Sequence, residues 1–175
     1  MDPLEIRKAG FTDLPRIMEI CDEARSIMRA DGNASQWTGG YPSEEVIRHD
    51  IDNANGYVIS CGGSLEGYFA FIPGIEKTYL EIEDGRWLED ALPYCTIHRL
   101  ASTVRSSGIA RACFEWSWAQ CRNLRIDTHE DNRIMRRCIE KFGFTYCGII
   151  HLHNGDPRLA YQKIQIFNHK KTNHE

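Results

Sequence analysis

The stretch VRSSGIARACFE, residues 104–115, places Arg105, two serines and Gly108 directly before a run with helical periodicity. Apolar residues recur at 109, 112, 113, 116 and 119, close to the 3.6-residue period of an α-helix. A bare loop that enters a helix presents unpaired N–H groups and the positive end of the helix dipole, which favours an anion. Arg105 adds a charge and a forked donor suited to phosphate. A simple turn with serine capping explains the same residues, so the rest of the chain has to decide.

Composition limits the classes of protein to consider. The chain has 175 residues, which fits one domain with a substantial core. Apolar residues make up 42% and charged residues 26%, as in ordinary water-soluble globular proteins. The net charge of −4 argues against a general nucleic-acid binder, although it leaves room for a local basic groove around a phosphorylated ligand.

The lack of a recognisable targeting segment and the scattered cysteines favour a protein of the reducing cytoplasm. No apolar run is long enough to span a bilayer, and MDPLEIRKAG lacks the apolar core of a signal peptide. The seven cysteines are scattered and show no CxxC spacing. We therefore expect neither disulfides nor a bound metal, no membrane or nucleic-acid partner, and a monomer or homodimer.

Periodicity and turn residues divide the first part of the chain into regular elements. In order, we expect a strand at 4–10, a helix capped by Thr12 that ends near 29, a loop at 31–42, a helix opened by Ser43, and a hairpin at 56–74. The hairpin turn is Cys-Gly-Gly-Ser, whose glycines suit a tight connection.

The second part continues the alternation. We expect a loop at 75–93 that could include a strand, a strand at 94–102, a helix from about 109 to 122, a strand at Leu124–Asp127, a helix within 131–144, two strands around a turn at 153–157, and a polar tail at 168–175. The inward positions of the helix within 131–144 are expected to be Ile134, Met135, Cys138, Ile139 and Phe142, with Gly143 as its C-terminal cap. This order predicts a single α/β domain over 1–167, built on one mixed sheet with helices on both faces.

The order of elements, with a strand that feeds an R-x-x-G-x-A loop, resembles the GNAT acetyltransferase superfamily. Residues 105–110 match the family's (Q/R)-x-x-G-x-(G/A) loop, and the match lies between a strand and a helix, as it must. A second match, within residues 127–144, resembles the family's segment that ends in E-K-x-G-F and includes Asn132. The resemblance extends over nearly the whole chain.

The resemblance implies a GNAT-like fold, with a mostly antiparallel mixed sheet, and an N-acetyltransferase that moves an acetyl group from acetyl-CoA, its co-substrate, to a primary amine of a small molecule or peptide. The family's cofactor positions carry over to the pantetheine-binding strand residues Leu100, Ala101 and Ser102, to the pyrophosphate loop Arg105, Ser106, Ser107, Gly108, Ile109 and Ala110, and to Asn132. A pantetheine arm contains two amides and can imitate a short strand, which gives the first three residues a physical role. Helix capping explains Asn132 equally well, and both roles can coexist.

Two positions depart from the family pattern. The link between the strand and Arg105 is only Thr103–Val104, shorter than the usual loop with a central proline. Many members place a tyrosine general acid at the position of Ile139, which cannot protonate a leaving thiolate. Tyr146, Cys147 or water would then serve, or the reaction would depend on proximity alone.

His98 is the first candidate for the general base, because it precedes the strand edge that would flank the pantetheine and can titrate near neutral pH. Strict strand alternation places His98 and Leu100 on one face and Arg99 on the other. A histidine hydrogen-bonded within the fold explains the same position. His129 and Glu130 are weaker candidates, since a solvated loop accounts for them.

Aromatic residues in polar loops indicate an acceptor pocket formed by Trp37, Tyr41 and Trp87. Packing of loops over the sheet ends is the alternative explanation. Acidic residues at 81, 83, 84, 89 and 90 would favour a cationic amine, or would form a solvated face. Two other functions fit the same motifs: a non-catalytic acyl-CoA-binding module or sensor, and a different nucleotide-phosphate binder.

Overall fold

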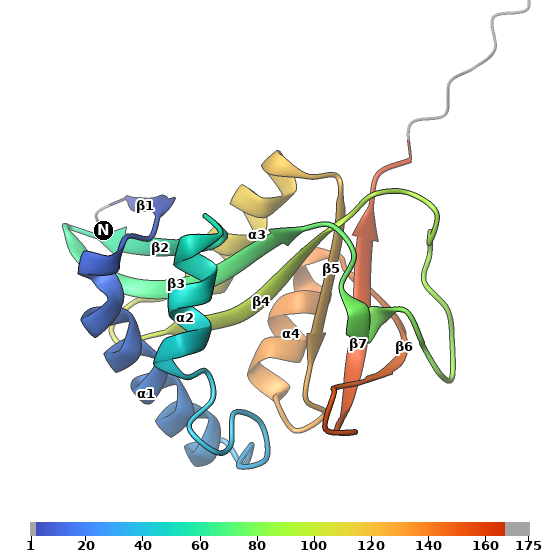
Figure 1. Cartoon of the computed structure of the whole chain (residues 1–175), viewed down its shortest axis with the longest axis horizontal. Helices are drawn as coiled ribbons and strands as arrows, with labels where there is room; N and C mark the ends of the chain where they lie inside the picture. Colours follow the sequence, from blue (N-terminus) through green and yellow to red (C-terminus); the bar gives the residue numbers. More distant parts are fainter. Residues whose placement is uncertain (1–2, 167–175) are drawn as a thin grey trace, which may run out of the picture.

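The computed structural model describes residues 3–166, which fold around one seven-stranded sheet with the strand order β1-β2-β3-β4-β5-β7-β6 (Figure 1). Its strands are β1 (Leu4–Lys8), β2 (Gly56–Cys61), β3 (Ser64–Pro73), β4 (Cys95–Ser102), β5 (Asn123–Thr128), β6 (Thr145–His151) and β7 (Pro157–Ile164). Its helices are α1 (Leu14–Ala30), α2 (Glu44–Asp52), α3 (Ile109–Gln120) and α4 (Arg133–Phe142), with short 3-10 helices η1 (Phe11–Asp13) and η2 (Lys77–Tyr79). The mixed sheet and the order of strands and α-helices confirm the expected fold class. The expected tail at 168–175 lies outside the described residues.

The start of α1 differs from the expectation. Thr12 does not cap the helix, because it lies inside η1, and α1 begins after Asp13. The Asp13 carboxylate accepts hydrogen bonds from the backbone N–H of Gly10 at 2.8 Å and from the Arg7 guanidinium at 2.8 and 2.9 Å. These bonds fix the chain in a 3-10 turn before the α-helix starts.

Local sequence signals elsewhere predicted the structure correctly. The Ser43 hydroxyl accepts a hydrogen bond from the Val46 N–H at 3.3 Å and caps α2. Gly62 and Gly63 both have positive φ, 56° and 83°, as a tight two-residue hairpin turn requires, and Gly143 caps α4 with a φ of 94°.

The helix α4 buries a narrower stripe than expected. Met135, Cys138 and Phe142 are partly buried and Ile139 is fully buried against the main core, but Ile134 is 47% exposed. The prediction for Ile134 was therefore wrong. The buried face of α4 is centred on Ile139, and Ile134 lies outside that face. The 75–93 segment contains η2 and a single β-bridge between Glu83 and Ile149, not a full strand.

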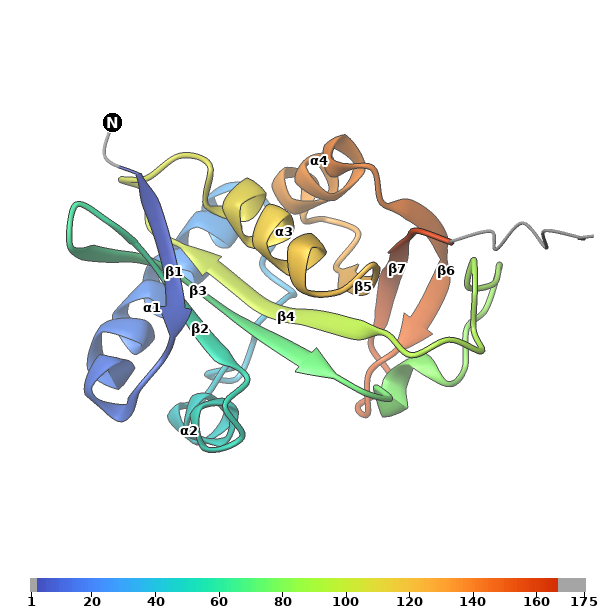
Figure 2. The same cartoon turned by 90° about the horizontal axis from the view of Figure 1, so that it is seen from above.

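The helices cover both faces of the sheet (Figure 2). Helices α1 and α2 pack on one face over a core that includes Ile17, Ile47 and Tyr68. Helices α3 and α4 pack on the other face over a larger core that includes Phe69 and Phe114. A third cluster under the 75–94 segment joins Tyr79, Trp87 and Tyr94 to β6 and β7.

The two central strands separate along their length. Strands β4 and β5 are parallel and pair only from Cys95–Leu124 to Ile97–Ile126. Beyond that point β4 continues against β3, and β5 continues against β7. A gap therefore opens in the middle of the sheet, and it exposes backbone edges that a continuous sheet would pair.

A β-bulge shapes the β4 side of this gap. Ala70 pairs with His98 and Tyr68 pairs with Ala101, so Phe69 alone lies opposite both Arg99 and Leu100. Arg99 has a φ of 56°, which is uncommon for a residue with a side chain. The extra residue breaks the strict alternation predicted for this strand. His98 and Arg99 both line the same cavity, while Leu100 also packs against the α3–α4 core.

Candidate active site

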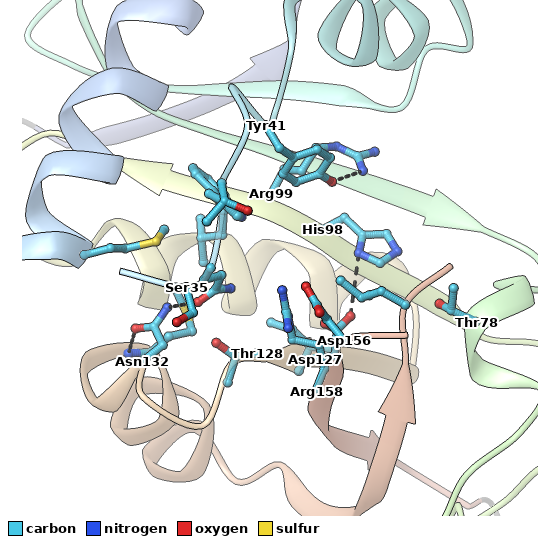
Figure 3. Close-up of a pocket in the computed structure, with 18 of the residues that line it drawn as sticks. Ser35, Tyr41, Thr78, His98, Arg99, Asp127, Thr128, Asn132, Asp156 and Arg158 are labelled. Atoms are coloured by element: carbon cyan, nitrogen blue, oxygen red, sulfur yellow. Dashed lines mark hydrogen bonds and ion pairs between the residues drawn. The ribbon is translucent and has the colours of Figure 1, made fainter. Parts of the chain in front are cut away.

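A cavity of about 420 Å³ opens at the gap between β4 and β5 (Figure 3). Its walls come from the ends of β4 and β5, the segment between α1 and α2, residues 76–78, the start of α4, and the turn between β6 and β7. Of the residues expected at the site, those that line the cavity are Trp37, Tyr41, His98, Leu100 and Asn132. The fold thus brings together side chains from distant parts of the sequence.

His98 lies in this cavity between two carboxylates. Its Nε2 atom is 3.0 Å from Oε2 of Glu76, and its Nδ1 atom is 3.9 Å from Oδ1 of Asp127. The Asp127 carboxylate also accepts a hydrogen bond from the Tyr79 hydroxyl at 2.5 Å. Burial first, and then the neighbouring Asp127, raise the pKa of Tyr79, so its hydroxyl remains a donor.

Glu76 remains a carboxylate over the whole physiological range of pH. The hydrogen bond with His98 lowers the pKa of Glu76 to about 2, against the opposing effect of burial, and bonds from the N–H and hydroxyl of Thr78 add to the lowering. The Glu76 carboxylate can only accept a hydrogen bond, so the Nε2 atom of His98 carries a proton and donates a hydrogen bond to Glu76. The Nδ1 atom faces the Asp127 side of the cavity and is an acceptor whenever the imidazole is neutral.

Arg99 joins the bulge to helix α2 and to the segment after α1. Its guanidinium makes a bidentate pair with Asp50, at 2.8 and 2.6 Å, and donates to the Tyr41 hydroxyl at 3.1 Å. Asp50 is 2% exposed and also accepts from the Tyr68 hydroxyl at 2.7 Å. Loss of one partner of such a buried pair costs about 3–5 kcal/mol, so the network fixes Tyr41 and the bulge firmly.

The segment between α1 and α2 meets the start of α4 at Asn132. The Asn132 side chain accepts from the Met135 N–H at 3.1 Å, as a helix cap, and donates to Gln36 at 2.9 Å. Trp37, next to Gln36, is buried against the α1 core and lines the cavity. Asn132 thus holds the wall of the cavity as well as its helix, and its expected contact with the coenzyme stays a prediction.

The expected phosphate loop lies beside this cavity without lining it. Thr103 anchors the loop, because its N–H donates to the Glu66 carbonyl at 3.0 Å and its hydroxyl donates to the Glu66 carboxylate. Arg105 is exposed, and no carboxylate of the described residues lies within ion-pair distance of it. Gly108 is the N-cap of α3, with a φ of 82° and no side chain that caps the helix.

These features fit the phosphate and pantetheine of an acyl-CoA. A Cβ added at Gly108 would meet no atom within 4 Å, so the start of α3 is open to a ligand. The buried Thr128 hydroxyl lines the gap at the end of β5 and has no hydrogen-bond partner among the described residues. The gap between β4 and β5 provides the unpaired strand edge that a pair of pantetheine amides can occupy.

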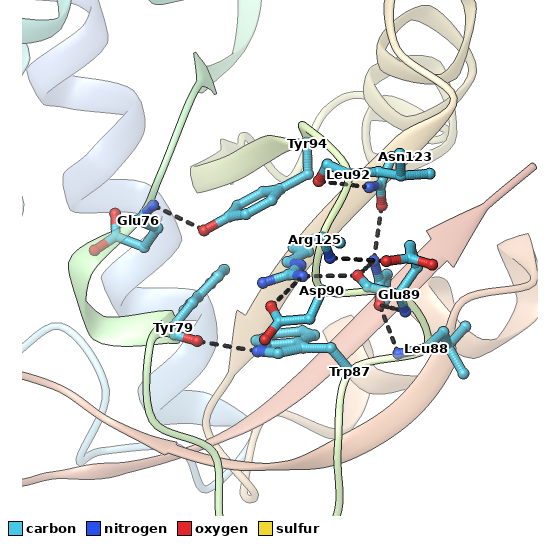
Figure 4. A network of polar contacts seen from close by, with 12 residues as sticks. Glu76, Tyr79, Trp87, Leu88, Glu89, Asp90, Leu92, Tyr94, Asn123 and Arg125 are labelled. Carbon is cyan, nitrogen blue, oxygen red and sulfur yellow. Dashed lines mark hydrogen bonds and ion pairs between the residues drawn. The ribbon is translucent and has the colours of Figure 1, made fainter.

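The segment before β4 holds Glu76 in place (Figure 4). The Glu76 N–H donates to the Tyr94 hydroxyl at 2.9 Å. The guanidinium of Arg125, on β5, lies 3.9 Å from the Tyr94 ring centroid and 4.0 Å from that of Trp87, and it pairs with Asp90 at 2.9 Å. This cluster secures a long segment whose backbone pairs with the sheet only at the single bridge between Glu83 and Ile149.

Several expected site residues lie away from the cavity. Trp87 donates to the Tyr79 carbonyl at 3.0 Å inside the third cluster and does not line the cavity, so its expected role with the acceptor stays a prediction. Tyr146 is half exposed on β6 and packs edge-on against Tyr161 at 5.7 Å. Ile139 is fully buried. The described residues contain no helix suited to span a membrane and no cluster of three or more His, Cys, Asp or Glu that could hold a metal ion.

Important residues of the cavity were not predicted from the sequence. Glu76 and Asp127 contact His98, Asp50 holds Arg99, and Arg158 lines the opposite wall. Asp127 ends a predicted strand that runs parallel to β4, and this position was a usable signal, because adjacent parallel strands end at the same edge. Glu76 lies in a segment without periodicity, and nothing near it in the sequence marks its role.

Comparison with known proteins places the chain in a family. It is similar to the crystal structure of a GNAT-family acetyltransferase from Streptococcus agalactiae, with 36% identity, a TM-score of 0.86, and coverage of 94% of this chain and 96% of that one. A GNAT-family acetyltransferase from Bacillus cereus shares the fold at 18% identity, with a TM-score of 0.60 and coverage of 94% and 99%. The ribosomal-protein-S18-alanine N-acetyltransferase from Escherichia coli also shares the fold, at 14% identity, with a TM-score of 0.63 and coverage of 96% and 98%. No protein-family model and no curated protein sequence matches the chain.

These similarities define the class of protein as an acyltransferase. The chain belongs to the GNAT family of acetyltransferases.

Proposed function

We propose that this protein is an acetyl-CoA-dependent N-acetyltransferase that transfers the acetyl group directly to a primary amine. The observation that carries the proposal is the gap between β4 and β5. Beside the gap lies the open N-terminus of α3, which suits a coenzyme phosphate. Along the gap lies a cavity lined with carboxylates, which suits a cationic amine. The two reactants would then meet within the gap.

On the coenzyme side, acetyl-CoA supplies the acetyl group in the activated form of a thioester. Arg105 and the free N–H groups at the start of α3 would hold its pyrophosphate, with Gly108 allowing the close approach. The unpaired edge of β4 at Leu100–Ser102 and the Thr128 hydroxyl would hold the pantetheine arm. Binding of both reactants in one geometry can supply roughly 7–11 kcal/mol of the required barrier reduction.

On the acceptor side, Glu76 and Asp127 would attract the ammonium form of the amine, and His98 would take its proton at Nδ1. The amine nitrogen then forms the amide C–N bond as the thioester C–S bond breaks. That nitrogen loses two protons in total: one passes through His98 to solvent, and the other goes to the leaving sulfur. Glu76 keeps the His98 ring in position while the proton moves.

The test is the release of coenzyme A from acetyl-CoA with a panel of primary amines. The proposal predicts thiol release that depends on the amine and on an intact His98. Binding of acetyl-CoA without release for any amine would contradict it.

A non-catalytic acyl-CoA sensor is the second candidate, and Ile139 favours it. This buried side chain replaces the tyrosine that protonates the leaving thiolate in many family members. A sensor would bind acetyl-CoA with the same residues around Gly108 and release no thiol. The amine panel therefore separates the two functions.

A further inference from the structure

Arg158 is a buried cation without a carboxylate partner. It is 7% exposed, yet it lines the cavity, and no carboxylate of the described residues lies within 4.0 Å of its guanidinium. Its Nη1 atom donates a hydrogen bond to the Pro157 carbonyl at 2.8 Å. A buried charge is costly unless it is paired, so an unpaired guanidinium at a cavity wall indicates a place for an anionic group.

Each carboxylate of the cavity has a hydrogen-bond partner other than Arg158. Glu76 bonds to His98 and Thr78, Asp127 accepts from Tyr79, and Asp156 accepts from the Asn154 side chain at 2.9 Å. None of these residues pairs directly with Arg158. The guanidinium therefore keeps donors available for a ligand.

The other cation of the cavity is differently placed. Arg99 uses its bidentate face for Asp50 and a further N–H for Tyr41. Figure 3 shows Arg99 and Tyr41 on one side of the cavity, with Arg158, Asp127 and Asp156 on the other. Arg158 is thus the cation of the described cavity whose charge is not committed to a buried carboxylate.

We propose that the acceptor is a free amino acid, which presents its ammonium group to Glu76 and Asp127 and its carboxylate to Arg158. The inference rests on the proposed function, because it names the class of amine that this site accepts. A planar carboxylate can take two parallel N–H bonds from a guanidinium, which makes Arg158 a specificity determinant and not only a source of charge. A cavity of about 420 Å³ is large enough for an amino acid.

The experiment compares matched pairs that differ only in the carboxylate: alanine with ethylamine, leucine with 3-methylbutylamine, phenylalanine with phenethylamine, and lysine with cadaverine. The readout is the ratio of kcat/KM for the amino acid to kcat/KM for the amine, from coenzyme A release. We expect the wild-type ratio to exceed roughly tenfold for at least one pair, as a charge-assisted bidentate contact would give. Arg158→Gln should bring that ratio close to one, and Arg158→Lys should give an intermediate ratio.

Two controls keep the result interpretable. Arg86→Gln removes an exposed arginine outside the cavity and should leave the ratio at the wild-type value. The methyl ester of each amino acid removes the negative charge without any change to the protein, so it tests the proposal even if Arg158→Gln fails to fold. We expect the ester to behave like the amine.

The proposal is overturned if the wild-type enzyme treats amino acid, ester and amine alike in every pair, or if Arg158→Gln keeps the preference. Turnover of simple amines under those conditions would leave the proposed function standing. If no amine is turned over, binding of the same compounds is measured by calorimetric titration. The proposal is then overturned if no amino acid binds. Failure to bind acetyl-CoA would instead contradict the proposed function itself.

Discussion

At the scale of single residues, the β-bulge at Arg99 adds the Arg99 side chain to the cavity that His98 lines. It places two consecutive polar side chains in one cavity, with His98 between Glu76 and Asp127. A histidine on the opposite face would pack among the apolar, largely aromatic residues of the α3–α4 core, away from the carboxylates of the cavity. Glu76 orients the His98 ring through Nε2, and Nδ1 faces the cavity, which is the geometry expected of a general base.

Replacement of His98 by Gln tests this role. Glutamine retains hydrogen bonding to Glu76 but loses the basic nitrogen, so we expect kcat to fall about 100-fold. Affinity for acetyl-CoA, measured by calorimetry, should hardly change. His151→Gln, at an exposed position of β6, is the matched control. Wild-type turnover in His98→Gln would return His98 to a structural role.

Glu76 provides a prediction for stability against pH. Its pKa is about 2 in the folded protein and 4.5 for an unperturbed glutamate, so folding favours the charged carboxylate. The stabilisation is therefore complete above about pH 4.5 and is lost as the pH falls towards 2. Urea unfolding between about pH 6 and about pH 2.5 should show a flatter acid decline for Glu76→Gln than for the wild-type protein. Parallel declines would show that Glu76 is not held as a carboxylate by His98.

Prediction from the sequence was weakest at the level of residues. His98, Trp37, Tyr41 and Asn132 were expected at a common site, and the structure brings them to one cavity. The pairing of His98 with Glu76 was out of reach, because it joins a strand to a loop across 22 residues without any local pattern. The bulge was equally hidden, since no glycine or proline marks it and Arg99 takes the unusual backbone angle itself.

At the scale of elements, the loop between β4 and α3 and the gap beside it form the proposed coenzyme side. The sequence predicted the position of this loop correctly, because its glycine and the flanking periodicities act locally. The gap between β4 and β5 was implied only by resemblance to the family. Where two strands stop pairing depends on the twist of the sheet and on their other neighbours, which local sequence does not encode.

Gly108 tests the open start of α3. Gly108→Val should lower acetyl-CoA affinity by more than about tenfold, because a branched side chain blocks the approach of an anion to the helix N–H groups. Gly63→Val is a matched control in the β2–β3 turn: the two glycines have φ values of 82° and 83°, with no atom within 4 Å of an added Cβ. Both variants introduce the same backbone strain. If both lose acetyl-CoA affinity equally, the loss in Gly108→Val comes from lower stability and not from a blocked phosphate site.

Arg105 gives a smaller effect at the same element. We expect Arg105→Ala to weaken acetyl-CoA binding roughly tenfold at low salt, as the loss of one charge-assisted bond to phosphate. The effect should shrink as salt is added, because Arg105 is exposed and screened. Equal affinities of the wild-type protein and the variant at low salt would remove Arg105 from the site.

At the scale of the whole molecule, two layers of helices cover the faces of a sheet that is split between β4 and β5. The prediction of one mixed sheet covered on both faces is confirmed, since the order of strands and α-helices in the chain matches the expected one. The position of the 75–94 segment was not predictable, because it packs through side chains on β5, β6 and β7 that are distant in sequence. Trp87 looked like a binding residue for this reason: from the sequence alone, no regular element was available to bury it.

Trp37 and Trp87 should therefore respond differently to substitution. Trp87→Ala removes a packed ring from the third cluster and should cost about 3–5 kcal/mol in the free energy of unfolding, while acceptor KM changes little. Trp37→Phe changes the cavity wall and should raise acceptor KM or lower kcat at a smaller cost in stability. Denaturant unfolding and steady-state kinetics of both variants separate the effects. A specific loss of acceptor binding in Trp87→Ala, without loss of stability, would restore its predicted role at the acceptor site.

Direct transfer of an acetyl group from acetyl-CoA to an amine within the cavity is the step on which the proposed function depends. It can be followed by a rapid-quench single turnover with acetyl-CoA labelled in the acetyl group, in which free thiol, labelled amine and protein mass are measured together. Direct transfer predicts one labelled amide for each thiol released, with no acetylated protein at any time. Thiol release without labelled amide, label that accumulates on the protein, or bound acetyl-CoA that never reacts would contradict it.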